Sequence, residues 1–227
     1  MNKLEVRDLS AAYINVNGRE VLRDVTFTLD AGEALLINGH NGSGKSTLLK
    51  VLAGLISATA GLISWSGCVV GQVRPEGPTH PWVGMQMQAE NVFAGLTVRC
   101  NVELAMKRSN SKTTYSHDRV LDDFPILSPL WNKRAGLLSG GQRKILALAM
   151  ATLGDAPLLL LDEPLAGLSG ENVSLVLACL RARKQAGAAM IIVEHSGTKL
   201  GNDLIDLRAE MIEGRLSPPC RLTAKEV

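Results

Sequence analysis

Apolar and polar residues alternate along two segments near the N-terminus, 3–13 and 21–29. Successive side chains of a strand point to opposite faces of its sheet, so this alternation predicts two strands that are buried on one face. Two later runs, 158–161 and 188–193, are apolar without interruption. They have the length of strands, and continuous apolar strands are typical of a parallel sheet that is covered on both faces.

Segments with helical periodicity lie between these predicted strands. Residues 47–55 follow this period after a strand predicted at 31–37 and a glycine-rich turn. Ser139 is placed to cap a helix that stops at Gly154, and a third helix is predicted to end at Gly187. Strands that alternate with helices indicate an α/β fold with a parallel sheet.

The remaining segments suggest how this single domain of 227 residues is organised. Residues 61–71 predict another strand with a turn, and the proline-rich segment 72–81 predicts a loop. Residues 88–135 contain short helical patches between polar stretches and no strong strand signal. We therefore expect a helical subdomain there, inserted into an α/β core formed by 1–87 and 136–227. The C-terminal stretch is predicted to end in a loose tail.

Composition and charge exclude several classes of protein. The net charge is only +2, without a long basic block, so we expect no nucleic acid as a partner. No apolar run approaches the roughly 20 residues that span a bilayer, and the N-terminus lacks the apolar core of a signal peptide. The four cysteines are far apart, which favours neither a zinc site nor a disulfide framework. We therefore expect a cytoplasmic protein. If it works at a membrane, another chain would hold it there.

A phosphate-binding motif follows the strand predicted at 31–37. It matches the pattern G-x-x-x-x-G-K-[S/T], and its residues are Gly39, His40, Asn41, Gly42, Ser43, Gly44, Lys45, Ser46 and Thr47. Glycines let successive backbone N–H groups curve around phosphate oxygens, and the helix that follows points its positive end at the same anion. We expect Lys45 to reach the β- and γ-phosphates of a nucleotide and the Ser46 hydroxyl to bind Mg²⁺.

Two adjacent carboxylates, Asp162 and Glu163, end the apolar run at 158–161. A P-loop NTPase holds Mg²⁺ partly through an acid at the end of a neighbouring buried strand, and Asp162 fits that position. Glu163 points to the other side of the strand, where it can polarise the attacking water as a general base. Beside a phosphate loop, these two roles are favoured over two solvated charges at a strand end.

The motifs together resemble those of one family, the ATP-binding-cassette ATPases. The sequences GHNGSGKST, LSGGQRK, LLLLDEP and VEH occur in the family's order and cover nearly the whole chain. The resemblance implies hydrolysis of ATP with Mg²⁺. It also implies a P-loop NTPase core of the RecA type with a parallel sheet, an N-terminal antiparallel β subdomain and an inserted α-helical subdomain.

The resemblance assigns roles to three more residues. Gln88 matches the glutamine that contacts Mg²⁺ and the attacking water, and it is favoured over Gln86 because it lies five residues before Phe93, as the family's pattern requires. His195 matches the histidine that touches the γ-phosphate. Tyr13 matches the aromatic residue on which adenine stacks, although it could instead be an ordinary strand aromatic.

The resemblance also implies partners. In the family two cassettes pair head to tail, as a homodimer or as a heterodimer, and the signature residues of one close on the γ-phosphate held by the other. Those residues here are Ser139, Gly140, Gly141 and Gln142. A single cassette without membrane spans is similar to the ATPase subunit of a transporter, peripheral on the inner face of the cell membrane. Separate membrane permease subunits would dock beside Phe93 and Leu96.

One position departs from the family's pattern, and several alternatives stay open. Ser169 stands where the family has an aspartate that ties the two subunits together, which predicts a weaker or differently tuned dimer. A soluble cassette ATPase without a transport role, such as one for iron–sulfur assembly, is the main alternative. A regulatory subunit with little hydrolysis is disfavoured by the intact Lys45, Asp162 and Glu163. Import and export are equally open.

Overall fold

The structure is a computed structural model that describes residues 3–13, 20–69, 80, 82–88, 92–108, 117–153, 156–194, 200–201 and 203–222. In chain order, its elements are β1 (Lys3–Ala12), β2 (Glu20–Asp30), β3 (Ala34–Asn38), α1 (Lys45–Leu52), β4 (Ala60–Trp65), β5 (Cys68–Val69), β6 (Val83–Gln86), α2 (Val98–Arg108), α3 (His117–Asp123), η1 (Pro125–Leu130), η2 (Ala135–Leu137), α4 (Gly140–Thr152), β7 (Leu158–Asp162), α5 (Gly170–Gln185), β8 (Ala189–Val193), β9 (Leu207–Ile212), β10 (Arg215–Leu216) and β11 (Cys220–Arg221).

These strands form two sheets. The smaller sheet is antiparallel, in the order β2-β1-β4-β5. The larger sheet has the order β10-β9-β3-β8-β7-β6, and its strands from β9 to β6 run parallel. The parallel order places the carboxyl ends of β3, β7 and β8 at one edge, which is where the phosphate loop and the paired carboxylates begin.

The run of leucines in β7 shows why the parallel sheet must be covered on both faces. Leu158 and Leu160 pack in the cluster that contains α1 and the antiparallel sheet, whereas Leu159 and Leu161 pack in the cluster that contains α4 and α5. Every residue of β7 is buried, including Asp162 at its end. Alternate side chains therefore serve two cores, and Asp162 continues the face that meets α1.

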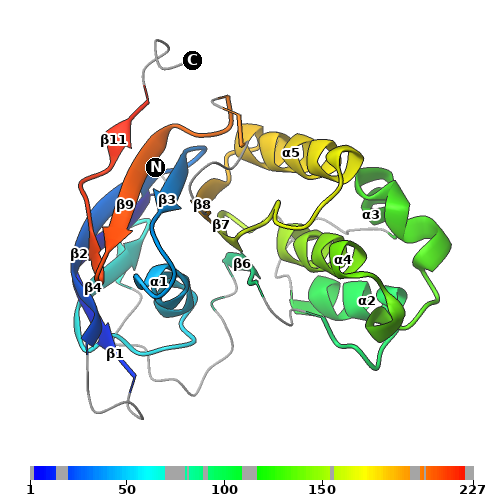
Figure 1. The fold of residues 1–227 in the computed structure, drawn as a ribbon, viewed down its shortest axis with the longest axis horizontal. Coiled ribbons are helices and arrows are strands. Elements are labelled where there is room, and N and C mark those ends of the chain that lie inside the picture. Colours follow the sequence, from blue (N-terminus) through cyan, green and yellow to red (C-terminus); the bar gives the residue numbers. More distant parts are fainter. Residues whose placement is uncertain are drawn as a thin grey trace.

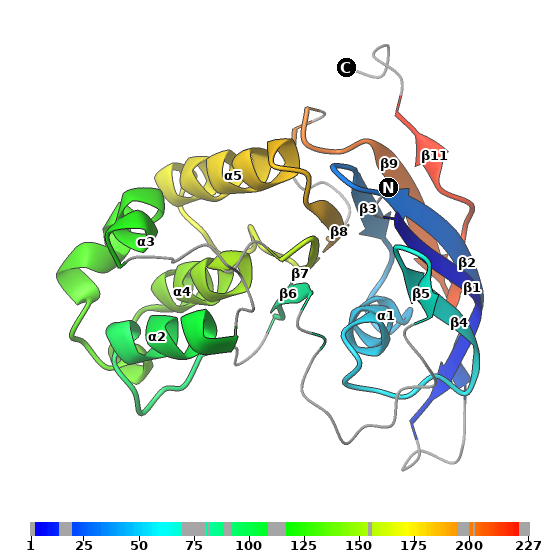
Figure 2. The ribbon, with the colours of Figure 1, turned by 180° about the vertical axis from the view of Figure 1, so that it is seen from behind.

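Figure 1 shows the resulting layers, and Figure 2 shows them from behind. The antiparallel sheet and α1 lie on one side of the parallel strands, with α1 between the two sheets. Helices α2 to α5 lie on the other side. The fold class predicted from the sequence is confirmed: an α/β core with parallel strands, an antiparallel β portion and additional helices.

Some strands were absent from the sequence prediction. No strand was predicted at β6, and the C-terminal stretch, treated only as leading to a loose tail, contains β9, β10 and β11. In β9 buried and exposed residues alternate strictly, because Leu207, Ala209 and Met211 face the core. Residues 223–227, the tip of the predicted tail, lie outside the described residues. Among the helices of the described part, none has the length and apolar character needed to cross a membrane.

Candidate functional site

The phosphate loop joins β3 to α1 at the carboxyl edge of the parallel sheet. Lys45 is buried, and its Nζ donates to the carbonyls of Gly39 at 2.6 Å and His40 at 2.9 Å. Burial lowers the pKa of the Lys45 ammonium, although the charges of Asp162 and Glu163 act in the opposite direction. The loop thus curls around the ammonium, which lies next to both carboxylates.

The loop's backbone leaves its curved side open to a ligand. Gly44 caps α1 with a left-handed backbone, no side chain caps the first turn, and no acidic residue lies in that turn. The first N–H groups of α1 therefore have no side-chain acceptor, and they favour an anion. His40, Asn41 and Gly42 are exposed at the mouth of the loop.

The other side of the loop is packed against the rest of the core. A Cβ at Gly39 would lie 2.4 Å from the Met211 carbonyl oxygen of β9. The Gly214 N–H, in the turn between β9 and β10, donates to the Ser43 carbonyl at 2.8 Å. The loop's shape is therefore held by β9 and by this turn, which the sequence prediction had not connected to the site.

Asp162 lies at the end of β7 and is only 2% exposed. The Ser46 hydroxyl at the start of α1 donates a hydrogen bond to its carboxylate. Burial raises the pKa of the Asp162 carboxyl above its ordinary value of 3.8, and the charge of Glu163 adds to this, while Ser46 and Lys45 oppose it. A buried carboxylate whose charge is disfavoured in this way would be stabilised by a cation.

Glu163 follows Asp162 with an unusual backbone and a fixed side chain. Its φ of 51° is in the left-handed region, and its N–H donates to the Val193 carbonyl of β8 at 2.8 Å. The Gln88 side-chain amide donates to Glu163 Oε2 at 2.8 Å. The structure thus brings together five residues to which the sequence analysis assigned roles: Lys45, Ser46, Asp162, Glu163 and Gln88.

The two glutamines near the end of β6 have different surroundings. Gln86 is 1% exposed, and its amide donates to the Met87 carbonyl at 2.9 Å and to the Asp162 carbonyl at 3.4 Å. Its amide therefore bonds only backbone groups, whereas the amide of Gln88 bonds the Glu163 carboxylate. This difference supports the register in which Gln88 is the functional glutamine.

Tyr13 lies at the end of β1, and its hydroxyl is 3.3 Å from Thr47 Oγ1 in the first turn of α1. The Tyr13 side chain, which follows a strand of the antiparallel sheet, therefore reaches the end of the phosphate loop. His195, predicted to touch the γ-phosphate, lies outside the described residues.

The signature motif lies at the start of α4. Ser139 is the N-cap, as the sequence predicted: its hydroxyl accepts from the Gln142 N–H at 3.3 Å, and the Gln142 side chain accepts from the Ser139 N–H at 3.0 Å. Ser139 and Gly140 are exposed. Because α1 and α4 pack on opposite faces of the sheet, the signature residues of one chain do not join its own phosphate loop.

Ser169 has a local role that the sequence prediction missed. It is the N-cap residue of α5, with an extended backbone, and its hydroxyl accepts from the Asn172 side-chain amide at 3.0 Å. Both Ser169 and Gly170 are exposed. The residue that replaces the family's aspartate is therefore on the surface, at the beginning of a helix.

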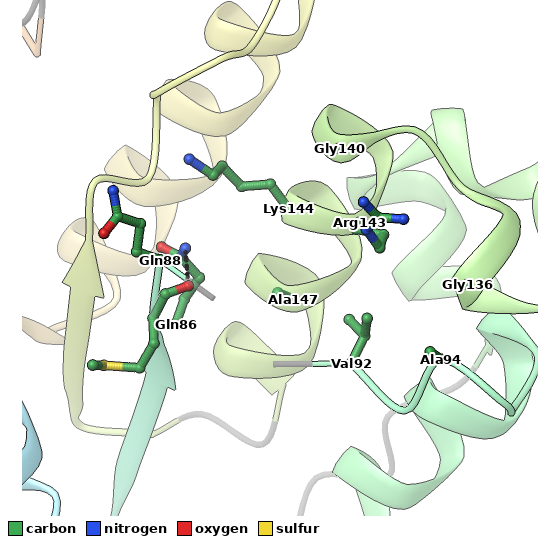
Figure 3. A pocket seen from close by; sticks show the side chains of 10 residues that line it. Gln86, Gln88, Val92, Ala94, Gly136, Gly140, Arg143, Lys144 and Ala147 are labelled. Carbon is green, nitrogen blue, oxygen red and sulfur yellow. Dashed lines mark hydrogen bonds between the residues drawn. The ribbon is translucent and has the colours of Figure 1, made fainter. Parts of the chain in front are cut away.

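A cleft of about 620 Å³ lies between the end of β6 and α4. It is lined by Gln86, Met87, Gln88, Val92, Ala94, Gly136, Gly140, Arg143, Lys144 and Ala147. In Figure 3, Lys144 reaches from α4 toward the segment after β7, on the side of Gln88, while Arg143 lies on the side of Gly136. The cleft thus connects the signature helix with the residues around Glu163.

Comparisons with known proteins agree with this geometry. The family model described as ABC transporter matches residues 22–166. The chain belongs to the ABC transporter family.

An Archaeoglobus fulgidus protein named probable branched-chain amino acid transport ATP-binding protein LivF is 31% identical over 211 residues, which cover 92% of this chain and 88% of that one. A solved structure of the ATP-binding subunit of an ABC transporter is 27% identical, covers 96% of this chain and 90% of that one, and has a TM-score of 0.83. A bacterial ABC transporter cassette solved as a dimer shares the fold at 20% identity, with a TM-score of 0.81 over 97% of this chain and 99% of that one.

This member of the ABC transporter family is an ATPase. It is the ATP-binding subunit of a transporter, and its hydrolysis of ATP drives transport. Sequence reasoning missed three residues near its site. Lys144 contacts the segment after β7, Gly214 holds the phosphate loop, and Glu194, 2% exposed after β8, accepts from the Leu165 N–H at 3.5 Å. Of the three, only Glu194 could have been found from the sequence, because it follows a second apolar run as Asp162 follows the first.

Proposed function

We propose that this ABC transporter subunit hydrolyses ATP with Glu163 as the general base, in composite sites formed by two cassettes. The observation that carries this is the placement of Glu163 next to the phosphate loop, with its side chain held by Gln88 and its N–H by Val193. A base must be held where it can take a proton from the attacking water. Fixing both the backbone and the carboxylate would provide this.

The phosphate loop would hold the triphosphate. The N–H groups of the first turn of α1 would donate to phosphate oxygens, and Lys45, now on the Gly39 and His40 carbonyls, would turn to the β- and γ-phosphates. Adenine would stack on Tyr13, which already reaches Thr47. His195 is proposed, from the family resemblance, to contact the γ-phosphate.

Mg²⁺ fits the residues beside the loop. Ser46 and Asp162 present hard oxygen ligands that already contact each other, and Gln88 lies close by on Glu163. Within the described residues, no group of three or more His, Cys, Asp or Glu is placed to hold a metal ion. That suits an ion held mainly by phosphates and water, with one or two protein ligands. When bound, Mg²⁺ would neutralise charge on the β- and γ-phosphates.

Two cassettes would pair head to tail, as a homodimer or as a heterodimer with a second subunit. The exposed Ser139 and Gly140 at the start of α4 form an anion site that the same chain's phosphate loop does not use. With Gly141 and Gln142, they would close on the γ-phosphate held by the partner. The related cassette that was solved as a dimer supports the pairing of two cassettes.

A cytoplasmic helix of a membrane permease would occupy the cleft between β6 and α4. Phe93 is 57% exposed, Leu96 39% and Leu137 68%, so apolar side chains that a helix could cover lie close in sequence to the cleft's lining. The charged side chains among the described lining residues are Arg143 and Lys144, and because carboxylates surround Lys144, Arg143 is the charge that would favour a helix with an acidic side chain. The subunit would then be peripheral, on the cytoplasmic face of the membrane.

The decisive experiment replaces the base. We expect Glu163→Gln to lower the ATPase rate by about 10²–10⁴-fold, the usual contribution of a general base, while ATP binding and ATP-dependent dimerisation remain. ATPase assays, equilibrium binding and light scattering would measure the three quantities on the purified chain. Glu5→Gln is the matched control, because it changes a partly exposed carboxylate on β1 that pairs with Arg7. A Glu163→Gln variant with rapid turnover would remove Glu163 from this role.

A further inference from the structure

Lys144, in the second turn of α4, reaches out of its helix to the segment that carries Glu163. Its Nζ donates to the Glu163 carbonyl at 2.9 Å and to the Ala166 carbonyl at 2.7 Å. The Ala166 N–H also donates to the Glu163 carbonyl, at 3.2 Å, and so closes a turn. One ammonium therefore bridges both ends of the turn that follows β7.

This turn has a backbone that needs external support. Glu163 is a residue with a Cβ, yet its φ is 51°, a left-handed conformation in which the Cβ lies too close to the following carbonyl oxygen. Surrounding contacts must hold a residue in such a conformation. The Glu163 N–H bonds Val193 on one side of the residue, and on the other side its carbonyl accepts from both the Ala166 N–H and the Lys144 ammonium.

The charges around Lys144 agree with a fixed position. The carboxylates that act on it are Asp162 at the end of β7, Glu163 directly after it and Glu194 after β8. Burial lowers the pKa of the Lys144 ammonium, and these three charges oppose that effect. Its hydrogen bonds to backbone carbonyls, with carboxylates nearby, give the ammonium both acceptors and compensating charge.

We propose that Lys144 is a positioning residue for the ATPase reaction, which fixes the backbone of Glu163 and ties it to the signature helix. Gln88 holds the Glu163 carboxylate, so the base is held at both ends by residues that line one cleft (Figure 3). A permease helix in that cleft would touch both supports of the base. This inference rests on the proposed role of Glu163. It identifies Gln88 and Lys144 as the residues through which docking of a permease helix would affect the base.

The test replaces the ammonium and keeps the apolar stem. Lys144→Met is expected to lower kcat by about 10–100-fold, because a catalytic group misplaced by about 1 Å loses this order of rate. The Kd for ATP without Mg²⁺ should stay within about twofold, since the hydrogen bonds of Lys144 go to Glu163 and Ala166, which lie outside the phosphate loop. Lys144→Arg, which keeps a charged donor of similar reach, should restore most of kcat.

Lys184 is the matched control. On α5 its Nζ donates to the Leu204 carbonyl at 2.8 Å and pairs with Asp206, so Lys184→Met removes an ammonium from a backbone carbonyl away from the site. We expect that variant to lose stability in urea but to keep kcat within about twofold. If Lys144→Met does not fold, Lys144→Gln, too short to bridge both carbonyls, takes its place with the same expectations.

Three results would overturn the proposal. They are a folded Lys144 variant with unchanged kcat, a loss of kcat no larger than that of Lys184→Met, and no recovery in Lys144→Arg. These outcomes are distinct from a failure of the base assignment. If Glu163→Gln turns over rapidly, the proposed function fails; if it is inactive while Lys144→Met is fully active, only the role of Lys144 fails.

Discussion

Substitution of Gly214 by alanine tests whether the turn between β9 and β10 shapes the phosphate loop. Gly214 has a φ of 82°, and its N–H donates to the Ser43 carbonyl at 2.8 Å. On its other side, a Cβ would lie 2.2 Å from the Val21 carbonyl oxygen of β2. The turn is therefore tightly fitted between β2 and the loop, and a methyl group can be admitted only if one of them moves.

Three effects determine how much stability Gly214→Ala is expected to lose. A residue with a Cβ in the left-handed region costs about 1 kcal/mol relative to glycine. Separating the methyl group from the Val21 carbonyl requires a shift of about 1 Å in packed backbone, and such overpacking costs about 1–3 kcal/mol. Weakening the bond to Ser43 removes up to about 1 kcal/mol. We expect Gly214→Ala to lower the free energy of unfolding by roughly 3 kcal/mol.

Gly67 provides the control for backbone conformation alone. Its φ of 77° is almost the same, but a Cβ there would meet no atom within 4 Å, because it lies in the open turn between β4 and β5. Gly67→Ala should therefore cost only about 1 kcal/mol. The difference between the two variants isolates the steric effect on the phosphate loop.

Urea unfolding and equilibrium binding of ATP measure the two consequences. Gly214→Ala should also weaken ATP binding by about tenfold, or 1.4 kcal/mol, because its displaced turn moves the Ser43 carbonyl and the loop with it. Gly67→Ala should bind ATP as the wild type does. The reasoning is refuted if both variants lose the same stability and Gly214→Ala retains the wild-type Kd for ATP.

Two further predictions concern Asp162 and Ser169. Between pH 3.8 and the raised folded pKa, the Asp162 carboxyl binds more protons in the folded chain than in the unfolded one, so its contribution to stability falls as the pH rises through that window. Calorimetry without nucleotide should thus show that Asp162→Asn raises Tm more at pH 7 than at pH 4; a gain that does not grow with pH would contradict this. Ser169 is exposed and its side chain makes no capping hydrogen bond to α5, so the free energy of unfolding of Ser169→Asp should stay within about 0.5 kcal/mol of the wild type, while ATP-dependent dimerisation measured by light scattering should strengthen; an unchanged dimer, ATPase rate and cooperativity would count against a role of this position between subunits.

The parts of the site that local sequence encodes were predictable. Phosphate-loop residues and the two carboxylates are recognised because glycine conformations, the helix start and the buried strand β7 all lie within short stretches of chain. The N-cap role of Ser139 could be predicted for the same reason, since a capping box spans only four residues. Gln88 followed from its distance to Phe93 in the family pattern, and its bond to Glu163 supports that choice.

Strands β6 and β9 show where local patterns were insufficient. β6 has four residues, one of them Gly84, whose absent side chain lets the Ala151 carbonyl of α4 approach: a Cβ there would lie 2.0 Å from it. In β9 the alternation is present, but Ala209, Glu210 and Met211 are not typical strand residues. Both strands form because parallel neighbours distant in sequence pair with them, and propensity carries no information about that pairing.

The sequence by itself determined the family and the order of the motifs, and it predicted the roles of Lys45, Asp162 and Glu163, because these depend on residue types at short, fixed spacings. Only the tertiary structure decided what holds them. Lys144 supports Glu163 from 19 positions away, and Gly214 supports Ser43 from the far end of the chain. Such contacts depend on how α4 and β9 pack across the sheet, and packing is a property of the whole fold.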